Sequence, residues 1–205
     1  MNAALATSRS PSRESIMTQL ATVLRDSAGS STNIESAIAG MKVSAQDITA
    51  NFGGNRELLL AMVRELSESM CEPLDTDSSN LDWRQRLFEF GQRVTDIYAT
   101  SHLRSLYRIA ITESIRHTGL GRDFFEAGPG HLTQRLGAFL QTAQAEGAIR
   151  AVDPQELASH FLASLRVHLD IADTFSQASR QVSDPASVHS VVNLFLDGIS
   201  GGTQP

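Results

Sequence analysis

The stretch Ser44 to Val63, SAQDITANFGGNRELLLAMV, joins a short polar helix to a longer apolar helix through two glycines. Ser44 is a favourable N-cap for a helix through Asn51, and the glycine pair predicts the end of that helix. Asn55 is expected to cap the next helix. The second helix should bury one stripe, because its apolar side chains have the spacing of one helical face: Leu59, Met62, Val63, Leu66 and Met70.

The residues before this stretch predict another short helix, from Ile34 to Met41, that follows a polar cluster at residues 30–33. Two short helices, a tight turn and a connector helix form a helix-turn-helix layout. In this motif the second short helix lies in the major groove of DNA. The sequence therefore predicts a small DNA-binding head joined to the rest of the chain by the connector.

At these residues the chain resembles the TetR family of bacterial transcription regulators. The residues that carry the resemblance are Ile16, Leu20, Val23, Leu24, Gly29, Thr32, Ile34, Val43-Ser44, Ile48, Phe52-Gly53 and Glu57-Leu58-Leu59. The resemblance implies an all-α fold with a three-helix N-terminal helix-turn-helix lobe, a connector helix, and a larger helical lobe for ligand binding and dimerisation. The helical layout extends over nearly the whole chain, whereas the specific motifs lie in about the first third.

The DNA-reading helix departs from the family pattern. Lys42 stands where the family usually has a turn glycine, and Asp47 places a negative charge on the helix. Four further positions lack the basic or aromatic side chains with which the family contacts phosphates and bases: Ala45, Thr49, Ala50 and Asn55. Because these contacts supply much of DNA affinity, two hypotheses stay open, a DNA-binding regulator and a relative that has lost DNA reading.

Composition indicates one globular protein rather than a basic nucleic-acid binder. The 205 residues are 41% hydrophobic and 20% charged, with a net charge of −6 and a pI near 5.5. Residues 1–70 hold six basic and seven acidic side chains, so the head is not basic either. The single cysteine, Cys71, fits a reducing compartment, and neither a signal peptide nor a membrane span is expected. We therefore expect a cytoplasmic protein.

We expect three segments: a flexible tail at 1–11, a helix-turn-helix domain at 12–54, and a helical ligand-binding and dimerisation domain at 55–201. Apolar periodicity predicts helices at 81–100 and 101–117, and a pair at 122–127 and 131–146 that Gly128-Pro129-Gly130 interrupts. Two further helices should begin at Asp-Pro pairs, at Pro154 and Pro185. Their excess apolar surface, and the family resemblance, predict a homodimer.

The candidate site residues fall into three sets. For DNA, we expect contacts from Lys42, Ser44, Gln46, Thr49, Asn51, Arg56, Arg9 and Arg13. Arg9 and Arg13 are candidates for the minor groove, against the commoner alternative of a solvated tail. For a small apolar effector, we expect a cavity lined by Phe90, Tyr98, Tyr107, Glu113, Phe125, Phe139 and His168. For the dimer interface, we expect Phe161, Leu165, Leu169, Val188, Val191, Val192 and Phe195.

Other chemistries find little support in the sequence. The six histidines form no His-x-x-x-His pair and there is no cysteine cluster, so no metal site is expected. Without a nucleophile motif or a dinucleotide or phosphate-binding glycine pattern, neither an enzyme nor a cofactor is expected. The leading hypothesis is a TetR-like, ligand-responsive regulator, a repressor that binds a double-stranded operator. The alternative is a dimeric ligand sensor, or a protein that acts through protein partners.

Overall fold

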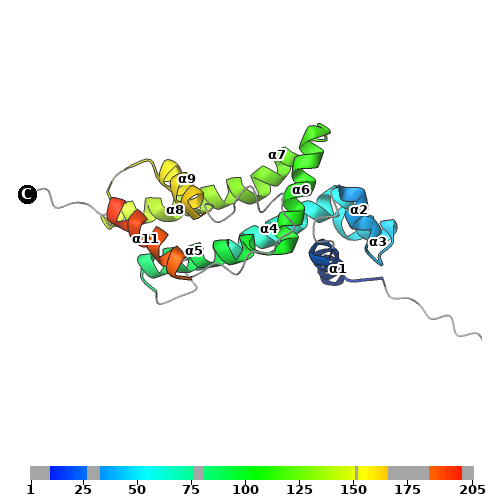
Figure 1. Ribbon diagram of the computed structural model, residues 1–205, viewed down its shortest axis with the longest axis horizontal. Helices are drawn as coiled ribbons and strands as arrows, with labels where there is room; N and C mark the ends of the chain where they lie inside the picture. Colours follow the sequence, from blue (N-terminus) through cyan, green and yellow to red (C-terminus); the bar gives the residue numbers. More distant parts are fainter. Residues whose placement is uncertain (1–9, 27–32, 76–80, 151, 166–184, 200–205) are drawn as a thin grey trace, which may run out of the picture.

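The computed structural model describes residues 10–26, 33–75, 81–150, 152–165 and 185–199. All regular elements in these ranges are helices (Figure 1). Three helices form the head: α1 (Arg13–Asp26), α2 (Ile34–Ala39) and α3 (Ala45–Phe52). The body consists of α5 (Trp83–Tyr98), α6 (Ser101–Ile115), α7 (Leu120–Phe125), α8 (His131–Ala145), α9 (Pro154–Leu165) and α11 (Pro185–Ile199). The long helix α4 (Asn55–Cys71), followed by the 3-10 turn η1 (Glu72–Leu74), belongs to both parts.

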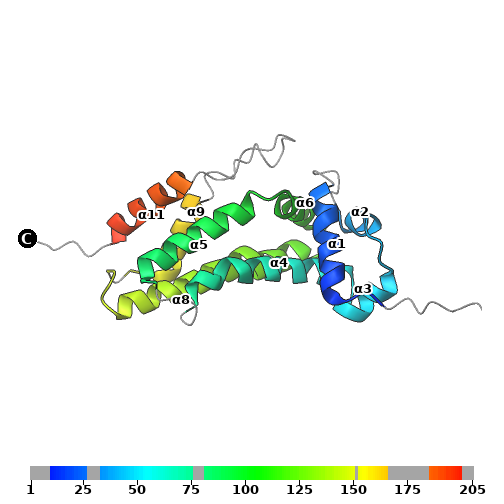
Figure 2. The same ribbon diagram turned by 90° about the horizontal axis from the view of Figure 1, so that it is seen from below.

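The molecule is elongated, with the head at one end and α9 and α11 at the other (Figures 1 and 2). Helix α4 leaves the head and runs along the body beside α8, while α5 runs beside them in the turned view (Figure 2). Helix α6 crosses near the head and packs against α1. The fold class expected from the sequence is confirmed, since a helical head is joined through α4 to a larger helical body.

Helix α4 is more deeply buried than a single stripe requires. Residues 58–63 are all buried, on every side of the helix. The reason is that this half of α4 packs against α2 and α3 of the head and against α7, α8 and the π-helical turn of the body. Helix α4 also begins differently from the prediction, because Gly54 is its N-cap and Asn55 is its first residue, with no side-chain cap.

The expected interruption at residues 128–130 is wrong. Residues Glu126–Gly130 form a π-helical turn, η3, that joins α7 and α8 into one helical run. Pro129 has no backbone N–H and cannot donate the hydrogen bond of an α-helix to the carbonyl four residues earlier. A π turn inside an α-helix tolerates such a residue. The buried Gly128 faces α4, where an added Cβ would lie 3.1 Å from Val63 Cγ1. Close packing against α4 therefore selects a continuous helix here.

The far end of the body is held by apolar packing. Phe161 of α9 is fully buried between Phe90 of α5 and Phe195 of α11, with ring centroids 6.3 and 4.9 Å away. Gly91 permits this approach, since a Cβ there would lie 3.4 Å from Phe161 and from Val188. Helices α9 and α11 begin at Pro154 and Pro185, as predicted. Asp153 caps α9 through hydrogen bonds from the backbone N–H groups of residues 155 and 156.

Candidate nucleic-acid interface and body residues

Helix α3 is defined by a cap at each end. The Ser44 hydroxyl accepts a hydrogen bond from the Asp47 backbone N–H at 3.1 Å. Gly53 adopts a left-handed conformation (φ 97°), and its N–H donates to the Thr49 carbonyl at 2.9 Å. Such a conformation favours glycine, which explains why the helix stops there. The buried Ile48 anchors α3, and the opposite face of the helix is exposed.

The residues predicted to contact DNA are not equally free to do so. Lys42 and Gln46 are exposed at the start of this region. The Thr49 hydroxyl donates to the Ala45 carbonyl, and the Asn51 amide donates to the Asp47 carbonyl. The Ser44 hydroxyl, besides its capping role, lies 2.6 Å from Asp47 Oδ2. The exposed face of α3 therefore offers Gln46 and Thr49 to a partner and carries no Lys or Arg.

The turn before α3 is fixed by side chains of the head. The Lys42 backbone N–H donates to Gln19 Oε1 of α1 at 3.1 Å. Helix α2 begins with a reciprocal capping box between Asn33 and Ser36. The bond to Gln19 holds the turn before α3 against α1, and the capping box fixes the start of α2.

Two arginines predicted to contact phosphate make intramolecular contacts with other elements. Arg56, at the start of α4, donates to the Thr118 carbonyl at 3.0 Å and pairs with Asp123 of α7. Arg13 donates to the Asn51 carbonyl at 2.8 Å and lies over the Phe52 ring. Arg9 lies outside the described residues. Lys42 differs from both arginines, because its side chain is exposed and only its backbone N–H is bonded to α1.

The pairing of Arg56 affects its partner. The hydrogen bond from Arg56 holds the pKa of the Asp123 carboxyl below its usual value, with partial burial opposing this shift. The carboxylate therefore stays charged at neutral pH and retains its attraction for Arg56.

Further contacts tie the head to α6. The buried Ser105 hydroxyl donates to the Leu24 carbonyl of α1 at 2.9 Å. Arg116, the C-cap of α6, lies 2.9 Å from Glu113 and 3.5 Å from Glu35 of α2. Sequence reasoning missed Ser105, Arg116, Thr118 and Asp123. No local pattern identifies them, because their partners lie far away in the sequence.

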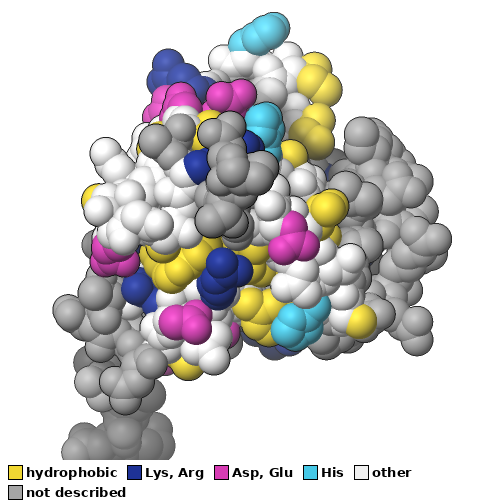
Figure 3. All heavy atoms as spheres, turned by 90° about the vertical axis from the view of Figure 1, so that its left-hand side faces the viewer, with side chains coloured by type: hydrophobic (Ala, Val, Ile, Leu, Met, Phe, Trp, Pro, Cys, Tyr) yellow, Lys and Arg dark blue, Asp and Glu magenta, His cyan; other side chains and the backbone are white. Residues whose placement is uncertain are grey.

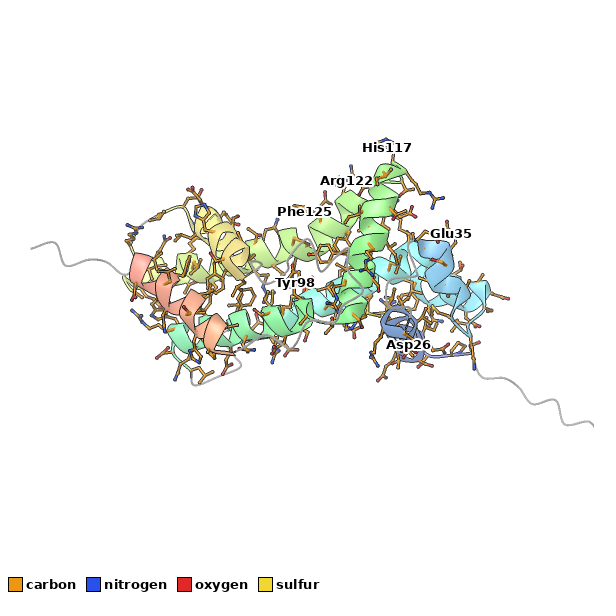
Figure 4. The ribbon with its side chains drawn as sticks, viewed as in Figure 1. Asp26, Glu35, Tyr98, His117, Arg122 and Phe125 are labelled. Carbon is orange, nitrogen blue, oxygen red and sulfur yellow. The ribbon has the colours of Figure 1, made fainter. Side chains whose placement is uncertain are left out.

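The seven residues predicted for an effector cavity are only partly brought together. The Tyr98 and Tyr107 hydroxyl groups lie 3.0 Å apart, and the Tyr107 ring packs edge-on against Phe124. Phe90 packs on Phe161 in the distal core. The side chain of Phe125 on α7 is 59% exposed, so within the protomer it does not line an interior cavity (Figure 4).

The remaining members of this set have other surroundings. Glu113 is buried and pairs with Arg116, which makes it part of the junction with the head. Phe139 lies beneath Arg86 in a hollow of about 250 Å³ that Leu74, Trp83 and Arg135 also line. His168 lies outside the described residues.

Four residues predicted for the dimer interface are buried inside the protomer. Phe161, Leu165, Val188 and Val192 are at most 3% exposed, because the three helices α5, α9 and α11 pack against one another. A side chain that is buried in one protomer offers a partner little contact area, and the assignment of these four to the interface stays a prediction. Val191 and Phe195 are half-buried, and Leu169 lies outside the described residues. Figure 3 shows that the end of the body near α11 exposes apolar side chains between charged and histidine side chains.

The described residues give no sign of other chemistry. They contain no group of three or more His, Cys, Asp or Glu side chains arranged to hold a metal ion. Among the described helices, none combines the length and the apolar character that crossing a bilayer requires. Burial raises the pKa of the Cys71 thiol to about 12, so this thiol stays protonated and unreactive at neutral pH.

Comparison with known proteins gives consistent matches. Residues 85–198 match the family model described as the C-terminal domain of AefR-like transcriptional repressors. A putative TetR-family transcriptional regulator from Mesorhizobium loti has a TM-score of 0.70 at 18% identity, over 93% of this chain and 99% of its own. The flavonoid-responsive regulator FrrA has a TM-score of 0.61 at 21% identity, over 91% of this chain and 98% of its own.

A third solved structure, the fatty acid degradation regulator FadR from Bacillus halodurans, has a TM-score of 0.63 at 14% identity, over 94% of this chain and all of its own. At these identities the structural matches show the shared fold alone. None of the curated proteins matches the chain in sequence.

Proposed function

Because the chain belongs to the TetR family of transcriptional regulators, we propose that it is a ligand-responsive repressor whose α3 helix reads operator DNA. TetR-family regulators typically act as homodimers that bind operator DNA. The observation that carries the proposal is the construction of α3, which is capped at both ends, anchored by Ile48 and exposed on its outer face. These features suit a helix that enters a major groove.

Base reading is assigned to Gln46 and Thr49, which lie three residues apart on the exposed face of α3. Glutamine presents both a donor and an acceptor and can pair with an adenine edge. Lys42, exposed at the turn, is positioned to contact a phosphate. The Ser44 side chain caps α3, and the Asn51 side chain donates to a carbonyl within α3. Each would have to give up that hydrogen bond to contact DNA.

The signal is proposed to pass from body to head through α4 and α6. Arg56 ties the start of α4 to the turn before α7, and Ser105 ties α6 to the end of α1. An effector that moves α6 or α7 therefore changes the position of the head directly. In a homodimer, such a movement changes the separation of the two α3 helices, and the two half-sites of an operator have a fixed spacing.

The effector is proposed to be a small, mostly apolar molecule that binds near Tyr98 and Tyr107. Their paired hydroxyl groups would supply polar contacts within aromatic surroundings that include Phe124. The response of FrrA to flavonoids supports an aromatic effector by analogy. For the dimer, we propose that α11 contributes the half-buried Val191 and Phe195 together with Leu194, whose side chain is 76% exposed.

The test is a titration of the purified full chain against the duplex upstream of its own gene. Salt is varied from about 50 to 200 mM, because phosphate contacts make affinity fall steeply with salt. A saturable, salt-dependent complex that a scrambled duplex does not form supports the proposal. Gln46→Ala should weaken specific binding by about 1–3 kcal/mol without changing the oligomeric state. Gln141→Ala, on the exposed surface of α8, is the matched control.

A second candidate function is favoured by the charge of the head. The described α3 carries no cation, and both Arg13 and Arg56 are engaged within the protein. A protein that kept the fold and lost DNA reading would sense its ligand and act through a protein partner. No saturable complex with the upstream duplex at low salt, together with an intact dimer, would favour this second function.

A further inference from the structure

Arg13 occupies the first position of α1 and reaches across the head to the end of α3. Its Nη1 donates to the Asn51 carbonyl oxygen at 2.8 Å. Its guanidinium carbon lies 4.2 Å from the centre of the Phe52 ring. The two partners are the last two residues of α3, so one side chain contacts the C-terminal end of the helix in two ways.

The C-terminal end of α3 needs such a contact for physical reasons. The last carbonyl groups of a helix have no partner within it, and they carry the negative end of the helix dipole. The N–H of Gly53 reaches the Thr49 carbonyl, which leaves the Asn51 carbonyl to a group from elsewhere. A cation that donates to this oxygen therefore satisfies a terminal acceptor and interacts favourably with the dipole.

Helix α3 is also too short to be stable alone. It has eight residues, whereas isolated helices of fewer than about 12–15 residues are marginal in water. Ser44 fixes its first turn from within the helix, and the contact from α1 fixes its last turn. The Arg13 side chain is thus one of the contacts that join α1 to the end of α3.

We propose that Arg13 is a positioning residue for the DNA-reading helix and not a phosphate contact. It holds the end of α3 against α1, so that Gln46 and Thr49 keep the orientation needed to meet base edges. This inference rests on the proposed function of α3. It differs from the expectation drawn from the sequence, in which Arg13 contributed its charge to DNA binding.

Lysine and glutamine at this position separate the two roles. Arg13→Lys retains the charge and would preserve a phosphate contact. It loses the planar group that stacks on Phe52 while donating to a carbonyl. Arg13→Gln removes the charge, and with it any phosphate contact, which would lower the slope of log affinity against log salt by about 0.9. Arg25→Gln, in the last turn of the same helix, is the matched control.

The experiment measures binding of the full chain to the duplex upstream of its gene and to a scrambled duplex, across a salt series. We expect Arg13→Lys and Arg13→Gln to lose roughly tenfold in specific affinity, the size of a charge-assisted hydrogen bond. Binding to the scrambled duplex and the salt slope should both stay as in the wild type. Wild-type affinity in Arg13→Lys, with a reduced salt slope in Arg13→Gln, would overturn the proposal.

Amide hydrogen exchange, measured without DNA, tests the role of Arg13 independently of whether the protein binds DNA. The backbone amides of α3 should exchange faster in Arg13→Lys and Arg13→Gln than in the wild type and in Arg25→Gln, while the amides of α8 remain unchanged. Unchanged protection of α3 in both variants would refute the positioning role, even if the wild type binds no duplex. If the wild type binds no duplex but α3 loses protection, the proposed function fails and the role of Arg13 in holding α3 stands.

Discussion

The head–body junction and the far end of the body are held by different kinds of interaction. The junction adds hydrogen bonds and ion pairs to the apolar packing of α4, among them Ser105 with Leu24 and Arg56 with Asp123. The far end uses apolar packing, in which Phe161 is buried against α5 and α11. Hydrogen bonds and ion pairs can exchange partners with little change in free energy, whereas close-packed side chains resist displacement. In the proposed mechanism the head moves relative to a stable body, and this division suits that movement.

The largest effect is expected at the far end. Phe161→Ala should lower the free energy of unfolding by about 3–5 kcal/mol, because it removes a large side chain and leaves a cavity between three helices. Urea unfolding at one fixed protomer concentration measures the change. Ile115→Ala, at a side chain that is 73% exposed on α6, should change it by no more than about 0.5 kcal/mol. Equal effects in the two variants would show that the far end is not close-packed.

A smaller effect is expected at the junction. Ser105→Ala should lower the free energy of unfolding by about 1 kcal/mol, because it removes a buried hydrogen bond between α6 and α1. The control is Ser164→Ala, since the exposed Ser164 hydroxyl donates to a carbonyl of its own helix at the same 2.9 Å. A cost as large as that of Phe161→Ala would contradict the distinction between a polar junction and an apolar far end.

The smallest effect concerns the pH dependence of the junction. His102 lies in a hollow between α1, α4 and α6, and the charged residues Arg25, Arg13, Glu14 and Glu65 also line this hollow. Burial, and then the charge of Arg25, lower the pKa of His102 below 6.5 in the folded protein. Below that pH the unfolded chain takes up a proton that the folded protein resists, so acidification reduces stability.

His102→Gln should therefore lose less stability than the wild type between about pH 7.5 and about pH 5.5, a range that spans the reference pKa of histidine. Unfolding by urea at the two pH values measures the difference. His160→Gln, on an exposed part of α9, should behave like the wild type. If His102→Gln also behaves like the wild type, His102 is not responsible for the acid sensitivity of the junction.

Much of the fold was predictable because local rules decide it. Ser44 and Gly53 set the bounds of α3, and Asp153 with Pro154 set the start of α9. Apolar periodicity located the body helices. The continuous α7–α8 run was not predictable, because the reason for it is the packing of Gly128 against Val63 of α4. Glycine and proline in sequence indicate a break, and only the neighbouring helix selects a π turn instead.

The candidate site was less predictable than the fold. The exposed positions of Lys42, Gln46 and Thr49 agree with a helix that offers one face to a partner. The internal engagement of Arg13 and Arg56 could not be foreseen, since their partners lie 38 and 67 residues away in the chain. Periodicity also cannot distinguish an apolar face that meets a second protomer from one that meets α5, and in this protomer Phe161 and Val188 lie against α5.

The sequence by itself determined the helical class, the position of the head, the caps of α3 and the family resemblance, because capping and periodicity act over a few residues. Only the tertiary structure decided which arginines hold the head together, which apolar faces are buried within one protomer, and which groups tie α6 and α7 to the head. These depend on contacts between residues far apart in the chain, and the same side chain can satisfy either an internal carbonyl or an external phosphate. Which of the two it contacts depends on the tertiary arrangement of the helices, and this cannot be read from the sequence.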